Sequence, residues 1–447
     1  MTHKNSTTTW NLTLKGIITA GLIIAMLIPA VLVQELIEER KARQHEVINE
    51  VSDKWARSQT LTGPFITVPY TYEEKRSDGN VFAEERLLTI LPETLHVAGE
   101  MTPHFKRRSI FEVALYKSDL ELTGNFLLDK KVAGAGETMH WERARLCIGV
   151  SDIRGIEKQP TGTLADRPLE FESGIATSAF EGVRGASAPA DLSRIEGPTT
   201  LAFSIPLQLK GSEMFKMLPL GKTTTADISS AWTSPSFTGN FLPEYELNEK
   251  GFSAQWNVLH FNRDFPQVWK HTTYKADDFS FGLSLLQPAD SYAKTLRTAK
   301  YAILFIGLTF GFFYLLEIIL GHRVHPVQYV LTGLALVVFY TLLLSISEVS
   351  SFNVAYPLSA MATIMLITTY SRHLFGAWKN ALMIGAFLTA LYGYIFILLQ
   401  LEDSALLAGS IGLFVLVAIA MHLSRKIDWY PPADKDDRSI AEAIKNI

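Results

Sequence analysis

Long apolar runs lie only towards the two ends of the chain, and a different pattern of polar and apolar positions fills the middle. The segment Tyr301–Ser347 is the clearest case, because two apolar runs, Tyr301–Leu320 and Tyr329–Ser347, flank one short polar loop. As a helix, each run is about long enough to cross roughly 30 Å of hydrocarbon. The pattern predicts a transmembrane helical hairpin in which Gly321 ends the first helix and Pro326 begins the second.

Similar runs elsewhere predict four further membrane-spanning helices. One lies near the N-terminus and three follow the hairpin, so that the predicted spans cover residues 16–33, 301–320, 329–347, 352–370, 381–401 and 406–423. The first run is longer than the apolar core of a typical signal peptide and no clear cleavage site follows it, which favours an uncleaved signal anchor over a cleaved signal. Six crossings place the two terminal segments, residues 1–15 and 424–447, on the same side of the membrane.

The central region, residues 63–290, has the pattern of β-structure. Short segments alternate apolar with polar positions, and turn clusters such as Ser77-Asp78-Gly79-Asn80 separate them. The predicted strands are Phe65–Tyr72, Leu87–Leu91, Phe111–Leu115, Leu120–Leu127, Leu201–Leu209, Ser253–Leu259 and Phe279–Leu286. Residues 34–62 have apolar positions at helical spacing and predict a juxtamembrane helix, which Gly63-Pro64 ends.

These patterns give the predicted fold class. We expect an α+β membrane protein with six transmembrane helices and a large β-rich domain inserted between helices 1 and 2. The size of that domain leaves open whether it forms one or two β-subdomains.

The charges of the short loops assign the two sides of the membrane, because basic residues are enriched in cytoplasmic loops. Basic residues occur at Arg323, then at Arg372 and Lys379, then at Arg425 and Lys426, whereas the intervening loops carry acidic charge at Glu348, Glu402 and Asp403. This alternation predicts that both termini are cytoplasmic and that the β-rich domain is extracytoplasmic. A mirror-image topology is the alternative.

Composition and motif searches narrow the function classes. The 447-residue chain has a formal net charge of -4, which gives no electrostatic footprint for nucleic acid. Cys147 is the only cysteine, so an intramolecular disulfide is impossible. Gly221-Lys222-Thr223 resembles the end of a phosphate-binding loop but has Lys216 where glycine is needed, and no HExxH or paired-cysteine metal motif occurs. We therefore expect no cofactor, no metal and no enzymatic activity.

Polar residues in or beside the predicted spans are the candidate functional residues. They are Glu317, His325, Gln328, Tyr329, Glu348 and Asp403. A carboxylate inside a span, as at Glu317, marks a functional site by default. Because Glu317 is near the membrane interface, the competing interpretation is that Arg323 or His322 pairs with it.

The other candidates also have simpler structural explanations. His325 is three residues from another histidine, but solvated loop histidines are the favoured interpretation over metal ligands. Gln328 and Tyr329 are expected to anchor a helix end. Glu348, at the outer mouth of the third span, either lines a polar cavity with Glu402 and Asp403 or is hydrated, and we favour hydration.

Two further patterns are also interpreted as structural. Gly307 and Gly311 form a small-xxx-small face that predicts close helix packing. The segment Trp232–Gly239, with Phe241-Leu242-Pro243 after it, is dense in aromatic residues, proline and glycine. It forms either a ligand-binding loop or a packed turn, and the packed turn is favoured because large aromatic side chains dominate protein cores.

Several stretches, in order along nearly the whole chain, resemble the CreD family of Gram-negative inner-membrane proteins. They are Leu61-Thr62-Gly63-Pro64, Asp152-Ile153-Arg154-Gly155, Ser234-Pro235-Ser236-Phe237 with Phe241-Leu242-Pro243, Pro288-Ala289-Asp290 with Lys300-Tyr301-Ala302, His325-Pro326-Val327-Gln328-Tyr329, Phe339-Tyr340, Ser347-Glu348 and Asp403-Ser404-Ala405-Leu406-Leu407. The resemblance implies an inner-membrane protein with a periplasmic domain. It also implies an association with envelope-stress signalling by a two-component system and with tolerance to colicins or cell-wall antibiotics. It supplies no catalytic residue.

Three function classes follow. The favoured one is a non-enzymatic envelope-integrity protein, anchored in the lipid bilayer, whose β-rich domain contacts a periplasmic or cell-wall-associated partner. The alternative is a transporter or lipid-handling protein in which Glu317, Glu348 and the outer-loop acids line a path. An envelope hydrolase is the least favoured. The sequence leaves the partner and the oligomeric state open.

Overall fold

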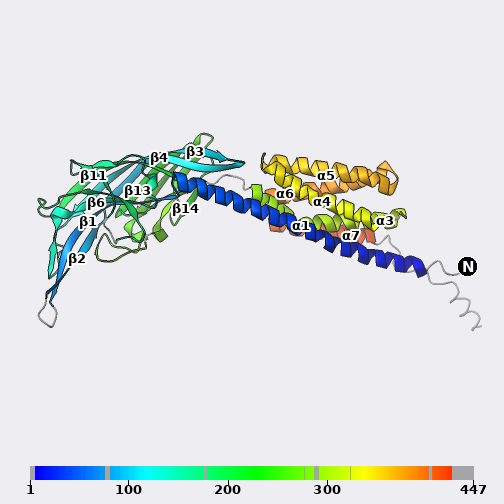
Figure 1. Cartoon of the computed structure of the whole chain (residues 1–447), viewed down its shortest axis with the longest axis horizontal. Helices are drawn as coiled ribbons and strands as arrows, with labels where there is room; N and C mark the ends of the chain where they lie inside the picture. Colours follow the sequence, from blue (N-terminus) through cyan, green and yellow to red (C-terminus); the bar gives the residue numbers. More distant parts are fainter. Residues whose placement is uncertain are drawn as a thin grey trace, which may run out of the picture. The chain divides into compact units, whose positions relative to one another are not determined.

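The computed structural model describes residues 6–75, 81–175, 179–275, 277–285, 291–322, 324–401 and 405–424. The chain divides into two compact units, of which one comprises Met1–Arg43 with Ala289–Ile447 and the other Gln44–Pro288. Helices make up the first unit and strands dominate the second (Figure 1). The long first helix contributes residues to both units.

The helical unit is built from apolar helices. Its elements are α1 (Ser6–Trp55, whose last residues belong to the other unit), α2 (Ser291–Lys300), α3 (Ala302–Leu320), α4 (Pro326–Ser347), α5 (Phe352–Phe375), α6 (Trp378–Gln400) and α7 (Ala405–Ser424). Among the described residues, five helices are long and apolar enough to cross a membrane, namely α1 and α3 to α6. The apolar stretch of α7, Leu407–Ile419, is shorter, so the sixth crossing stays a prediction.

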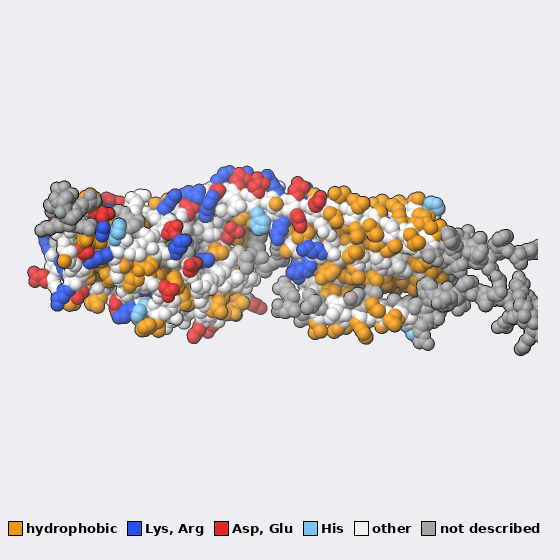
Figure 2. Space-filling model, turned by 90° about the horizontal axis from the view of Figure 1, so that it is seen from below, with side chains coloured by type: hydrophobic (Ala, Val, Ile, Leu, Met, Phe, Trp, Pro, Cys, Tyr) orange, Lys and Arg blue, Asp and Glu red, His pale blue; other side chains and the backbone are white. Residues whose placement is uncertain are grey.

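The surface of these helices fits a lipid environment. Apolar side chains cover much of the visible face of the helical unit, whereas charged side chains are spread over the β-rich unit (Figure 2). Ile303, Val338, Met365 and Leu382 are among the large apolar side chains that the helices expose. Such exposure is costly in water and favourable in hydrocarbon.

The predicted hairpin is present as α3 and α4, and its sequence defines both helix ends. Gly321 follows α3 with a φ of 66°, a left-handed conformation that glycine adopts without strain. Pro326 is in the first turn of α4, where its missing N–H has no helical partner to lose. Both predicted helix boundaries are confirmed.

Aromatic side chains fill the centre of the helical unit. The ring of Phe305 in α3 lies 4.5 Å from that of Tyr392 in α6, and the ring of Phe339 in α4 lies 4.8 Å from the same tyrosine. Tyr340 and Tyr356 extend this cluster, and all five side chains are buried. In lipid, where the hydrophobic effect does not drive helices together, packing of this kind supplies much of the association energy.

Close helix packing occurs at glycines other than the two predicted, and Gly333 is an example. A Cβ at Gly333 of α4 would lie 2.7 Å from the Met26 side chain of α1 and 2.9 Å from the Phe310 ring. Added Cβ atoms at Gly307 and Gly311 would meet nothing within 4 Å among the described residues. The predicted packing role of that small-residue face is therefore wrong within this part of the chain.

The described residues of the β-rich unit form two sheets. The strands of the larger are β1 (Gln59–Lys75), β2 (Val81–Ile90), β5 (Glu137–Met139), β6 (Arg145–Val150), β9 (Glu172–Ser173), β10 (Arg184–Pro189), β12 (Met214–Met217), β14 (Ser236–Gly239), β17 (Val268–Lys270) and β18 (Phe281–Ser284). This ten-stranded sheet follows the order β14-β18-β12-β1-β6-β10-β9, with β2 and β5 also paired to β1 and β17 to β2.

The second sheet is eight-stranded and has the order β15-β16-β13-β3-β4-β11-β7-β8. Its strands are β3 (Thr94–Arg108), β4 (Phe111–Leu128), β7 (Thr161–Leu164), β8 (Arg167–Glu170), β11 (Thr199–Ser212), β13 (Thr223–Ser230), β15 (Glu244–Asn248) and β16 (Gly251–Leu259). Short 3-10 helices join several strands, namely η1 (Trp141–Arg143), η2 (Ile153–Gly155), η3 (His260–Asn262) and η4 (Asp277–Phe279).

Both sheets contribute to one hydrophobic core. It contains Phe65 and Phe215 from the larger sheet together with Val97, Leu122 and Ile228 from the smaller. Along β16, buried and exposed positions alternate, as expected for a strand with one face in the core. The alternative of two β-subdomains is therefore not what the unit forms; it is one body with a shared core.

Some predicted boundaries are wrong because long-range pairing overrides the local pattern. The predicted strands Phe111–Leu115 and Leu120–Leu127 are parts of one strand, β4, which pairs along its length with β3 and β11. The juxtamembrane helix predicted to reach residue 62 ends at Trp55, and Gly63-Pro64 lies inside β1. The turn cluster at residues 77–80 lies outside the described residues, although β1 and β2 pair as the predicted hairpin requires.

Candidate functional site

The Glu317 carboxylate is the centre of a buried polar cluster in the helical unit. The residue is 7% exposed and lies in the last turns of α3. Oε1 accepts hydrogen bonds from Lys15 Nζ of α1 and from the Val324 backbone N–H at 3.1 Å. Oε2 accepts a hydrogen bond from the Tyr329 hydroxyl at 3.3 Å. The cluster therefore ties α1, α3 and α4 together through one carboxylate.

The loop between α3 and α4 is shaped to supply these donors. The His325 Nδ1 atom accepts a hydrogen bond from the Val327 N–H at 3.3 Å, and the Gln328 Oε1 atom accepts one from the His325 N–H at 2.9 Å. Together they form a capping box that satisfies free N–H groups at the start of α4. The structure thus brings Glu317, His325, Gln328 and Tyr329 together, with His325 and Gln328 used in helix capping.

The partner of Glu317 differs from the one expected. His322 lies beside the Leu320 carbonyl and the Phe375 ring, and Arg323 lies outside the described residues. Lys15 is the cation that contacts the carboxylate, although 302 residues separate the two along the chain. The sequence indicates this pair only through the position of Lys15 just before the first apolar run. A lysine there is equally explained by the enrichment of basic residues on the cytoplasmic side of a membrane span.

Glu348 forms a second polar cluster at the other end of α4. The Tyr292 hydroxyl of α2 donates to Glu348 Oε1 at 3.1 Å, and Arg40 Nε of α1 lies 3.9 Å from the same oxygen. The Glu348 side chain keeps 16% of its surface exposed beside these two partners, so the expected hydration of its carboxylate stays a prediction. Asp403 lies outside the described residues, and the cavity it was expected to share with Glu348 stays a prediction.

In the β-rich unit, Asp152 organises the chain at the end of α1. Its carboxylate accepts hydrogen bonds from the Arg57 N–H at 3.1 Å and from Arg154 Nη2 at 2.7 Å. Arg154 Nη1 in turn donates to the Asp53 carbonyl of α1. The hydrogen bonds from Arg154 lower the pKa of the Asp152 carboxyl to about 2. The network fixes the last turn of α1 against η2.

Position 155 leaves no room for a side chain, which explains the glycine there. A Cβ at this position would lie 2.4 Å from Gln59 Nε2 and 2.7 Å from the Lys210 carbonyl oxygen. Gln59 itself donates to the Asp152 carbonyl oxygen at 3.0 Å. The residues Asp152-Ile153-Arg154-Gly155 therefore have a structural task, which is to pack closely against the start of β1.

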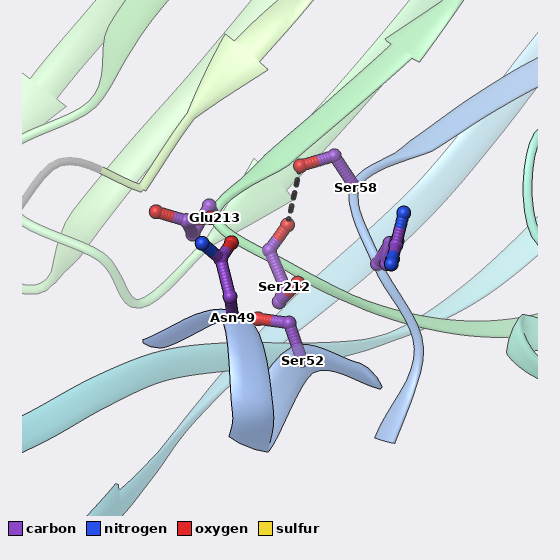
Figure 3. Close-up of a pocket in the computed structure, with 6 residues that line it drawn as sticks. Asn49, Ser52, Ser58, Ser212 and Glu213 are labelled. Atoms are coloured by element: carbon purple, nitrogen blue, oxygen red, sulfur yellow. Dashed lines mark hydrogen bonds between the residues drawn. The ribbon is translucent and has the colours of Figure 1, made fainter. Parts of the chain in front are cut away.

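A polar pocket of about 550 Å³ opens beside this network, and all of its lining belongs to the β-rich unit. It is lined by Asn49, Ser52, Arg57, Ser58, Ser212 and Glu213. Figure 3 shows the Asn49 and Ser52 side chains, which project from α1, next to Ser212 and Glu213, which follow one another at the end of β11. The Ser58 hydroxyl donates to the Ser212 carbonyl oxygen at 3.1 Å and joins the two walls.

Glu213 has an unusual backbone conformation at the mouth of this pocket. Its φ is 59°, which is in the left-handed region that residues other than glycine rarely adopt. Three hydrogen bonds fix the turn: its N–H donates to the Ala114 carbonyl at 3.2 Å, and its carbonyl accepts from the Leu285 N–H at 2.7 Å and the Ser284 hydroxyl at 3.2 Å. Although the side chain keeps an exposed surface, partial burial raises the pKa of its carboxyl. His45 opposes this rise in pKa.

Trp55 lies at the end of α1 among three lysines. The ammonium groups of Lys106, Lys210 and Lys117 lie 4.6, 4.8 and 5.7 Å from the centre of its ring. Lys117 also pairs with Glu157 at 2.7 Å. Cation–π attraction offsets part of the repulsion between these positive charges.

The aromatic segment around Trp232 is a packed structural element, as the favoured interpretation held. Trp232 is 7% exposed and its Nε1–H donates to the Ser234 carbonyl at 2.8 Å. The Phe237 ring lies 4.8 Å from that of Tyr245 and 5.8 Å from that of Trp256. The sequence carries no local signal for the pocket residues, because Ser52 and Glu213 are far apart along the chain and neither belongs to a motif.

Comparisons with known proteins agree with the sequence motifs. A family model described as "CreD: Inner membrane protein CreD" matches residues 11–430. The inner membrane protein CreD of Escherichia coli strain K12 is 31% identical over 419 residues, which cover 92% of each chain.

Solved structures add nothing to this assignment. An M1 zinc metallopeptidase from Deinococcus radiodurans matches 38% of each chain at 8% identity, with a TM-score of 0.18. A variant of that peptidase matches 38% of each chain at 9% identity, with a TM-score of 0.19. These scores are too low to support an argument about fold or activity. The family match and the relative together decide the matter: the chain belongs to the CreD family of inner membrane proteins.

Proposed function

We propose that this protein supports the integrity of the cell envelope by binding or scaffolding, with its β-rich unit in the periplasm and both termini in the cytoplasm. The observation that carries the non-catalytic part is that residues of the CreD-like motifs make structural contacts. Asp152 and Arg154 hold the end of α1, His325 and Gln328 cap α4, and Phe339 packs in the aromatic centre. Residues engaged in this way serve the fold rather than a reaction.

The topology part of the proposal rests on the short loops. Arg372 and Lys379 flank the connection between α5 and α6, whereas Glu348 follows α4 at the other end of the helices. Because basic residues are enriched in cytoplasmic loops, this distribution supports a periplasmic position for the β-rich unit.

The surface that we expect a partner to contact is the β15 edge. β15 ends the order of the smaller sheet, and every residue of the strand is exposed. Tyr245 and Leu247 expose 56% and 52% of their surface there. Apolar side chains on a strand edge favour association with another chain.

The test is site-specific crosslinking in cells. A photoreactive residue at Tyr245 or Leu247 of the full-length protein should trap one or more defined envelope partners, and the yield should rise under cell-wall stress. A matched site at Leu127, which is 50% exposed on β4, serves as the control. Identical adduct patterns at all three sites, or none in stressed cells, would count against binding through this edge.

A transporter or lipid-handling role is the second candidate function. The observation that favours it is a set of buried hydroxyl groups in the helices, at Thr309, Tyr340, Ser359 and Ser371, that have no hydrogen-bond partner among the described residues. Polar groups inside a membrane bundle often line a path for ions or substrates. If this role is right, Glu317→Gln and Glu348→Gln abolish complementation of a deletion strain without lowering the amount of protein.

A further inference from the structure

The polar pocket at the end of α1 contains two buried hydroxyl groups that the fold does not use. Ser52 is 4% exposed and Ser212 is 0% exposed, and neither side-chain oxygen has a hydrogen-bond partner among the described residues. Both residues line the same pocket. A buried hydroxyl without a partner destabilises a fold, because its hydration is lost and nothing replaces it.

A neighbouring serine shows what a structural hydroxyl looks like in this unit. Ser118 is 2% exposed, and its hydroxyl donates to the Leu209 carbonyl oxygen at 2.8 Å. The contrast with Ser52 and Ser212 is one of pairing, not of burial. Unpaired groups that converge on one pocket are expected where a ligand supplies the missing hydrogen bonds.

The backbone next to Ser212 supports the same interpretation. Glu213 has a positive φ and is held by hydrogen bonds on both its N–H and its carbonyl group. Figure 3 shows its side chain on the same side of the pocket as the amide of Asn49. Strained residues that the surrounding structure fixes firmly cluster at binding sites.

The charges of the lining restrict the class of ligand. Glu213 supplies a carboxyl group and Arg57 a guanidinium group, so the pocket has no excess of either sign. Arg57 is already paired with Asp53, which leaves little charge to bind an anion. The remaining groups are one amide and three hydroxyls, each able both to donate and to accept hydrogen bonds. An uncharged ligand rich in hydroxyl groups matches this set.

We propose that this pocket binds a small uncharged saccharide, with Ser52, Ser212, Asn49 and Glu213 as its hydrogen-bonding groups. A volume of about 550 Å³ is in the range of sites for one small ligand. The inference rests on the proposed periplasmic position only for the source of the saccharide, which would be envelope glycan. Binding itself is testable on the purified protein, so that its failure and the failure of the proposed function are distinguishable.

The experiment measures binding of N,N′-diacetylchitobiose to the full-length protein in a detergent without a sugar headgroup, by saturation-transfer NMR and calorimetry. We expect saturable binding that weakens at least tenfold in Ser52→Ala and Ser212→Ala. Because those hydroxyls are unpaired, the melting temperature of each variant should stay unchanged or rise. The control Ser118→Ala should bind normally and melt at a lower temperature.

A further variant covers the case in which a core serine substitution disturbs folding. Asn49 is exposed on α1, so Asn49→Ala should fold normally and still weaken binding. The inference is overturned if the wild-type protein does not bind the disaccharide, or if all three pocket variants bind it as well as wild type does. Preferential binding of the diamine putrescine over the disaccharide would also overturn it, since Glu213 would then be a site for a cation.

Discussion

Replacement of Glu317 should show how much one buried carboxylate contributes to the helical unit. Glu317→Ala removes the acceptor of three donors: the Lys15 ammonium, the Val324 N–H and the Tyr329 hydroxyl. Breaking a buried ion pair from one side costs about 3–5 kcal/mol, because the other charge loses its partner. Lys15 keeps 34% of its side chain exposed, so we expect the lower end, about 3 kcal/mol.

Two companion variants separate charge from hydrogen bonding. Tyr329→Phe removes one hydrogen bond at 3.3 Å. It should lower the free energy of unfolding by about 0.6 kcal/mol, the average for a hydrogen bond between membrane helices. The double variant Lys15→Met with Glu317→Gln removes both charges and keeps similar side-chain volumes. Its stability should be within about 1 kcal/mol of wild type, a smaller loss than that of Lys15→Met alone or Glu317→Gln alone. The single changes should therefore be strongly non-additive.

The assay is reversible unfolding of the full-length protein in mixed micelles, followed by helix content as the denaturing detergent is raised. Complementation of a deletion strain is measured in parallel at equal protein levels. The reasoning is refuted if the double variant is destabilised by the sum of the single changes. A Glu317→Gln variant that is stable but inactive would support the transporter hypothesis, because a purely structural role of Glu317 does not predict this result.

Three further predictions concern the β-rich unit. The pKa of the Asp152 carboxyl is about 2 in the folded protein and about 3.9 in the unfolded chain. Its ionised form therefore stabilises the fold above about pH 3.9, and this stabilisation is lost as the pH falls through the folded pKa. Unfolding followed by tryptophan fluorescence should show that wild type loses more stability than Asp152→Asn between about pH 4 and pH 2. Gly155→Ala should lower the free energy of unfolding by about 1–3 kcal/mol in urea denaturation, because the new Cβ would lie 2.7 Å from the Lys210 carbonyl oxygen. Gly134→Ala should cost less, because Gly134 is exposed and its new Cβ would meet only the end of the Glu137 side chain, at 3.1 Å. Burial raises the pKa of the Cys147 thiol to about 11, so maleimide should label it in urea but not in the native protein, and rapid native labelling would contradict its placement in the core.

Much of the helical architecture could be predicted, because membrane helices are encoded locally. Length and apolarity define α3 to α6, and single residues such as Gly321 and Pro326 define helix ends. The aromatic segment near Trp232 was also interpreted correctly, since its density of large rings already indicates packing.

The contacts that give meaning to the polar residues could not be predicted in this way. Glu317 finds Lys15 across 302 positions, and Ser52 meets Ser212 only because α1 ends beside β11. The sequence also suggested that Gly63-Pro64 would stop a helix, but pairing of β1 with β6 and β12 makes this segment a strand. Local pattern carries little information about which distant strands pair.

The proposed topology can be tested most directly by cysteine accessibility in intact cells. Phe261 is 84% exposed in the β-rich unit, His322 is exposed between α3 and α4, and the native Cys147 is buried and should not interfere. A membrane-impermeant maleimide, added after the outer membrane is permeabilised, should label Phe261→Cys before lysis and His322→Cys only after lysis. Labelling of His322→Cys before lysis, with Phe261→Cys protected until lysis, would invert the topology and remove the basis for a periplasmic partner.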